Sequence, residues 1–172
     1  MTRFCWLILT VFLIVLMEIM ASNLGIFFAG PFFLCFYLTV SHGWRHGLMC
    51  GAVVCVVSEI VLGRQMTILP LLTVPSILGC AWRRYGDRRF LTHQVLPGIV
   101  LGLCYASFFL VFETGGLGPP STHLPIRQAL LILAGSVFIS IVIFPLLVLS
   151  LDAVSHLIDE GTYRQRTRLR RG

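Results

Sequence analysis

The chain has 172 residues, of which 57% are hydrophobic and 12% are charged, and its mean hydropathy is +0.91. Globular proteins carry about 25% charged residues, so this composition excludes an ordinary water-soluble domain and a disordered chain. All 13 basic residues are arginine, and with seven acidic residues they give a net charge of +6. We therefore expect an integral membrane protein whose arginines mark cytoplasmic loops, and no binding of nucleic acid.

Six apolar runs follow one another along the chain, separated by short polar or glycine-rich breaks. A bilayer span needs about 20 apolar residues. The first run continues into further membrane sequence, so we interpret it as a retained span and not as a cleaved signal peptide. We predict an all-α polytopic membrane protein with six transmembrane helices, over residues 4–21, 26–40, 47–62, 66–82, 95–112 and 128–151. Residues 1–158 would form one transmembrane domain, and residues 159–172 an arginine-rich cytoplasmic tail.

The arginines predict the orientation of these spans. Six spans place both termini on one side, and eleven of the 13 arginines then share that side, which is typical of the cytoplasm. Arg64 and Arg127 remain opposite. The tail arginines serve as topology anchors, a role compatible with binding anionic lipids. The predicted cytoplasmic anchors are Arg83, Arg84, Arg88, Arg89, Arg164, Arg166, Arg168, Arg170 and Arg171.

Three carboxylates lie within or beside the apolar runs, namely Glu18, Glu59 and Glu113. Charge at membrane depth is costly, so each is a candidate functional residue. Glu18 and Glu113 lie near the predicted outer ends of their spans, where we expect interfacial side chains that reach water. For Glu59 we favour a structural or partner-binding role over proton relay.

The clearest local pattern is a series of residues at spacing four that leads to Glu59. Gly43, Gly47, Gly51 and Cys55 precede it in this register, and such residues share one side of a helix. Small residues let another helix approach closely in lipid. We predict that this face packs against another helix or a partner, and that the 47–62 span lies at the centre of the bundle.

The sequence contains no motif for catalysis or metal binding. Its six cysteines lie in apolar runs without zinc-ligand spacing, as expected of small buried side chains. Motifs of intramembrane proteases, nucleotide-binding loops and hydrolases are also missing. We therefore expect no catalytic residues, no metal and no cofactor, and we predict that the protein is not an enzyme.

One stretch of the chain resembles a known family. It runs from Gly30-Pro31-Phe32-Phe33-Leu34, through Gly43-x3-Gly47-Leu48-Met49-Cys50-Gly51, to Glu59 and Leu62-Gly63. This stretch, together with the length, the six predicted spans and the charged loop between the fourth and fifth of them, resembles the rod shape-determining MreD family of bacterial inner-membrane proteins. That family is considered similar in fold to the substrate-binding components of energy-coupling-factor transporters.

The resemblance implies a non-catalytic scaffold of the cell-elongation complex, which synthesises peptidoglycan and maintains cell shape. The implied partners are an MreC-like protein, a RodA-like glycosyltransferase, a class B penicillin-binding transpeptidase and the MreB cytoskeleton. The fold kinship leaves an alternative, a substrate-binding membrane component for uptake of a vitamin or metal. Its pocket would lie near the outer ends of the spans, among Glu18, Asn23, Glu59, Glu113 and the 115–120 loop.

Overall fold

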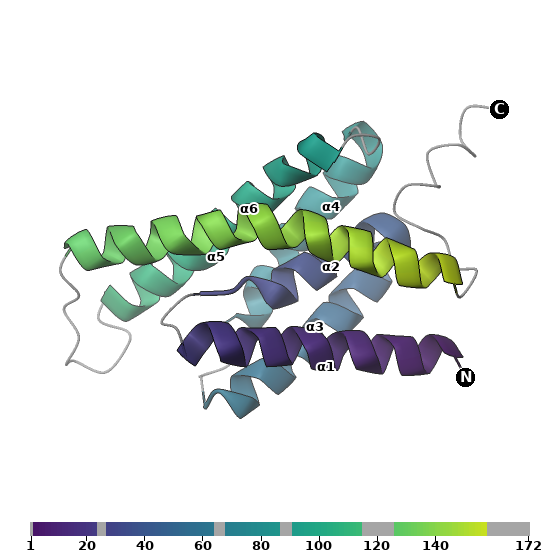
Figure 1. Cartoon of the computed structure of the whole chain (residues 1–172), viewed down its shortest axis with the longest axis horizontal. Coiled ribbons are helices and arrows are strands. Elements are labelled where there is room, and N and C mark those ends of the chain that lie inside the picture. The colour runs from purple at the N-terminus through teal and green to yellow at the C-terminus, as the bar shows by residue number, and fades with distance from the viewer. Residues whose placement is uncertain (1, 24–26, 64–67, 87–90, 115–125, 158–172) are drawn as a thin grey trace.

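The computed structural model describes residues 2–23, 27–63, 68–86, 91–114 and 126–157, and this part of the chain is all-helical (Figure 1). Its six α-helices follow the order of the six predicted spans. Three of them contain stretches long and apolar enough to cross a membrane, so this is a membrane protein. These stretches are Trp44–Val61, His93–Val111 and Arg127–Ser155. The elements are α1 (Thr2–Asn23), α2 (Gly30–Ser41), α3 (Trp44–Val61), the 3-10 helix η1 (Leu69–Leu72), α4 (Thr73–Tyr85), α5 (Leu91–Thr114) and α6 (Ile126–Leu157).

The central helix is α2, which lies in the middle of the bundle (Figure 1). All 12 of its residues are buried, with α3 and α4 packed along it. We predicted the 47–62 span at this position, and that prediction is wrong, because α3 leaves Met49, Val53 and Ile60 exposed. The physical reason is the side-chain pattern: α2 carries apolar and aromatic residues on all sides, which favours complete burial. By contrast, α3 has only one face of small residues.

The segment that leads into α2, residues 27–29, is not helical, although we predicted a helix from residue 26. The helix begins only at Gly30, with Pro31 in its first turn, where proline is tolerated. Phe28 and Ala29 are buried, and the backbone N–H of Phe27 donates a 3.2 Å hydrogen bond to Ser136 Oγ on α6. Non-helical backbone at membrane depth is stable only where protein encloses it, and this segment meets that condition.

The predicted 66–82 span is divided in two. Residues 69–72 form η1, and α4 follows directly from Thr73 to Tyr85. Pro70 lies in η1 and Pro75 in the first turn of α4. Because each proline lacks a backbone N–H donor, a single continuous α-helix through both positions is unfavourable.

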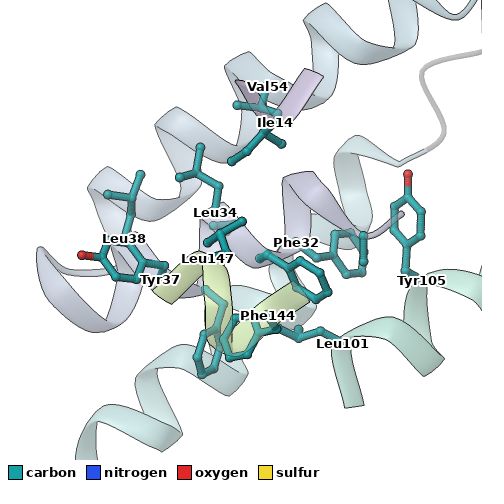
Figure 2. Packing of buried hydrophobic residues seen from close by; sticks show 14 of the residues in the cluster. Ile14, Phe32, Leu34, Tyr37, Leu38, Val54, Leu101, Tyr105, Phe144 and Leu147 are labelled. Atoms are coloured by element: carbon teal, nitrogen blue, oxygen red, sulfur yellow. The ribbon is translucent and has the colours of Figure 1, made fainter. Parts of the chain in front are cut away.

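Helices α5 and α6 form an antiparallel hairpin and pack along one another (Figure 1). Aromatic contacts join this hairpin to the other helices. Figure 2 shows Phe144 of α6 among side chains of α2 and α5, and its ring lies 5.1 Å from that of Phe33 and 5.6 Å from that of Phe36. Tyr105 of α5 meets Phe32 edge-on at 5.1 Å. Edge-to-face geometry is favourable for aromatic pairs, so these rings fix the hairpin against α2.

Candidate functional site

The closest helix contact in the resembling stretch lies between α3 and α2. A Cβ atom added at Gly47 would lie 2.7 Å from the carbonyl oxygen of Cys35 and 2.8 Å from the backbone nitrogen of Thr39. One added at Gly51 would lie 2.8 Å from the Cβ of Cys35. Carbon atoms do not approach so closely without moving a neighbour. Glycine at both positions therefore allows α3 to pack directly on the backbone of α2.

The structure places four of the five residues of the predicted face on one side of α3, where Gly47, Gly51, Cys55 and Glu59 are all buried. Gly43 differs, because it precedes the helix as its N-cap residue and has a φ of 115°. Only glycine adopts such a backbone readily. Gly43 therefore shares the four-residue spacing by coincidence. Its role is to adopt the backbone conformation of the turn before α3.

Glu59 fixes the chain beyond α3. Its side chain is 1% exposed, and its Oε1 accepts a 2.8 Å hydrogen bond from the backbone N–H of Ile68, just before η1. The thiol of Cys55, one turn earlier on α3, interacts with the same carboxyl group. Ile68 is itself buried. Glu59 thus supplies a partner for a backbone donor that would otherwise be buried without one.

Glu18 occupies an interhelical position, and the interfacial, water-reaching side chain that we predicted is wrong. It is 1% exposed, and its Oε1 accepts a 2.9 Å hydrogen bond from the phenol of Tyr105 on α5. Helix α1 continues to Asn23, so Glu18 lies more than one turn inside its end. At this position in α1, the carboxyl group of Glu18 is closer to the neighbouring helix than to water, so it bonds to Tyr105 of α5.

The buried polar groups Glu18, Cys55, Glu59 and Tyr105 come from α1, α3 and α5. Helix α1 packs against α3 and is bonded to α5 through Glu18 and Tyr105. The Cys55 thiol lies within electrostatic range of both carboxyl groups. Within residues whose side chains are described, no three His, Cys, Asp or Glu side chains group closely enough to hold a metal ion. The third candidate acid, Glu113, lies in the last turn of α5, but its side chain falls outside the described part. The hydrogen bonds described for these groups join Tyr105 of α5 to Glu18 of α1, and the backbone of Ile68 to Glu59 of α3.

A second polar contact joins α2 to α6 and was missed by sequence reasoning. The phenol of Tyr37, which is fully buried, donates a 3.0 Å hydrogen bond to Asp152 Oδ1 and lies 3.3 Å from Ser155 Oγ. Asp152 was the one signal available, as an acid near the end of the last apolar run. Its partner, more than 100 residues earlier, cannot be identified from a single sequence.

Glycines at spacing four also occur on α5, and we did not single them out. A Cβ atom added at Gly98 would lie 3.0 Å from the Cβ of Phe144, and one added at Gly102 would lie 2.5 Å from the Cβ of Ser140. Both glycines face α6 and let the hairpin close. The same four-residue spacing that marked α3 would have found them.

The predicted basic anchors are described only in part. Arg83 and Arg84 are exposed in the last turn of α4, where the helix dipole favours positive charge. Arg88, Arg89 and the arginines of the tail lie outside the described residues.

Comparison of the chain with protein-family models, with curated proteins and with solved structures finds no match.

Proposed function

We propose that this chain is a non-catalytic scaffold of the bacterial cell-elongation complex, which supports peptidoglycan synthesis and cell shape. One observation carries the proposal, the close packing of α3 on α2. The stretch that resembles the MreD family, Gly30 to Gly63, contains these two helices, and Gly47 and Gly51 form the contact between them. The residues that carry the resemblance therefore include a helix–helix contact, which fits a protein that acts through packing and binding.

The scaffold spans the bacterial inner membrane six times, with both termini in the cytoplasm. The start of α1 and the end of α6 lie on the same side of the molecule (Figure 1), which supports an even number of spans. Arg45, Arg83 and Arg84 are exposed at helix ends assigned to the cytoplasm, whereas Arg127 lies in the first turn of α6 at the other end. This distribution agrees with the excess of positive charge expected in cytoplasmic loops.

The scaffold acts through helix–helix contacts with an MreC-like protein, and the RodA-like glycosyltransferase and class B penicillin-binding transpeptidase join through the same complex. Apolar side chains exposed on the bundle provide the surface for such contacts and for lipid. Helix α1 carries many of them, and they span a broad side of that helix. These residues are Ile8, Leu9, Phe12, Leu13, Leu16, Met17 and Met20.

The second candidate function is a substrate-binding component for uptake of a vitamin or metal. The observation in its favour is the burial of Glu18, Glu59 and Tyr105 toward the predicted outer ends of the spans. Against it, the phenol of Tyr105 bonds to Glu18, and Glu59 bonds to the backbone of Ile68. One oxygen of each carboxyl group is thus engaged in packing within the bundle, which favours the scaffold as the proposed function.

Crosslinking in native membranes, followed by pull-down and mass identification, tests the scaffold. We expect an MreC-like protein to be captured by the wild type and by Gly135→Ala, since a Cβ atom at Gly135 has no atom within 4 Å. Gly51→Leu should lose capture, because its side chain meets Cys35 of α2. A purified chain that holds a vitamin stoichiometrically and captures no MreC-like protein would overturn the proposal.

A further inference from the structure

Two helix ends distant in the sequence meet at the predicted cytoplasmic face. Gly43 lies in the turn between α2 and α3, and a Cβ atom placed on it would be 3.5 Å from Nη1 of Arg83, in the last turn of α4. Arg84 follows Arg83 directly, and Arg45 is the second residue of α3. The fold therefore brings the Arg83–Arg84 end of α4 to the turn that precedes Arg45, although no pattern in the sequence connects these residues.

Two of these cations have no acidic partner among the described residues. Arg45 and Arg84 are exposed, and neither forms an ion pair within the part of the chain that the structure describes. Each guanidinium group lies instead over a neighbouring aromatic ring, 5.4 Å from the centre of Trp44 and 5.5 Å from that of Tyr85. Cation–π contact orients the guanidinium group but leaves its positive charge uncompensated. An anion from outside the chain can therefore bind both groups.

The surroundings of these arginines identify the membrane interface. Trp44 is 52% exposed and Tyr85 is 79% exposed, and these two residue types concentrate where lipid headgroups meet the hydrocarbon. Farther along the same helices, Met49 and Ile77 are also strongly exposed, as side chains facing lipid tails are. At about 1.5 Å per residue, they lie about 6–10 Å along the helix axes from the arginines. Long arginine side chains easily reach headgroups over such distances.

We propose that Arg45, Arg83 and Arg84, together with Trp44 and Tyr85, form a binding site for the phosphate-bearing headgroup of an anionic phospholipid. Guanidinium groups bind phosphate through paired N–H donors. The aromatic rings flank the guanidinium groups at the interface, and the exposed apolar side chains of α3 and α4 contact the lipid tails. An acidic peptide would match the arginines alone, whereas a phospholipid also matches the exposed aromatic rings beside them and the exposed apolar side chains farther along both helices.

This site is independent of the proposed scaffold role and of the arginine tail. It uses the ends of α3 and α4 and would exist in a transporter component as well. Its failure would therefore leave the elongation-complex proposal untouched, and loss of partner capture would leave the lipid site untouched.

Native mass spectrometry of the full chain tests the site. The protein is reconstituted in nanodiscs of phosphatidylcholine with a minor share of phosphatidylglycerol, and the retained lipid is identified. We expect the wild type to retain phosphatidylglycerol several-fold above its share, and Arg45→Gln/Arg84→Gln to lose this enrichment. Arg127→Gln is the matched control, because it removes an exposed arginine at the opposite end and should retain the enrichment.

Further variants separate charge from fold. Arg45→Lys/Arg84→Lys should keep most of the enrichment, since lysine still attracts phosphate as a point charge. Circular dichroism verifies that each variant is folded, and the single variants Arg45→Gln and Arg84→Gln replace the double variant if it is not. Unchanged enrichment in the folded glutamine variants would overturn the site. Three other results would also overturn the site. They are an enrichment that is lost only when the five tail arginines are replaced, displacement of the lipid by inorganic phosphate, and binding of a polyglutamate peptide in place of lipid.

Discussion

The phenol of Tyr105 on α5 donates a 2.9 Å hydrogen bond to Glu18 on α1, and both side chains are at most 1% exposed. This bond links the first helix directly to the α5–α6 hairpin. Tyr37 makes a corresponding link from the central helix to Asp152 of α6. The hairpin is therefore positioned by aromatic packing together with a few specific polar contacts, and the polar contacts set its orientation.

We expect Tyr105→Phe to lower the free energy of unfolding by about 1 kcal/mol, the usual scale for a hydrogen bond between membrane helices. The ring remains to pack against Phe32, so the change isolates the hydroxyl group. Denaturant unfolding in detergent micelles measures the effect. Tyr85→Phe is the control, because that hydroxyl group belongs to an exposed residue. Equal stability of the two variants would contradict the role assigned to Tyr105.

The α3–α2 contact predicts opposite outcomes for two glycine-to-alanine changes. Gly47→Ala should destabilise the protein by about 1–3 kcal/mol, as overpacking does, because its new methyl group meets backbone atoms of Cys35 and Thr39. Gly135→Ala, on α6, should be neutral or slightly stabilising, since the space around it is open and alanine favours helix. Thermal unfolding in detergent compares them. A Gly47→Ala protein as stable as Gly135→Ala would show that α3 does not approach α2 so closely.

The α5–α6 contact allows a compensation experiment. Gly102→Ala should destabilise the hairpin because its methyl group meets the side chain of Ser140. Adding Ser140→Gly removes the obstructing Cβ atom and should restore much of the lost stability, which gives a coupling energy between the two positions. The double-mutant cycle is measured by unfolding in detergent. Strictly additive effects would mean that the two residues are not in contact.

Glu59 is expected to act as a hydrogen-bond acceptor. Glu59→Gln keeps an oxygen for the N–H of Ile68 and should change stability little, whereas Glu59→Ala leaves that buried donor unpaired at a cost of about 1–3 kcal/mol. Unfolding in detergent and capture of the MreC-like partner are measured together. A glutamine variant that is stable yet loses all partner capture would show that the charge itself is required.

The sequence allowed prediction of the helices but not of their mutual positions. Hydropathy identified all six, because each depends on a local run of apolar residues. It misplaced the start of α2 and the break at η1, since prolines and tertiary hydrogen bonds determine those ends. The spacing-four pattern identified Gly47 and Gly51, whose role depends on one helix face. It could not reveal Tyr105 as the partner of Glu18, because nothing local links two residues 87 positions apart.

The enclosure of α2 also constrains how the protein is made. Its 12 residues extend only about 18 Å, less than the roughly 30 Å hydrocarbon core of a bilayer. In the non-helical segment before it, the backbone N–H of Phe27 has Ser136 of α6 as its hydrogen-bond partner. Surrounded by lipid alone, this segment would leave backbone groups unsatisfied. During synthesis, α2 can therefore become stable only after helices that emerge later from the ribosome have closed around it. We expect its membrane insertion to be a late, cooperative event despite its early place in the chain.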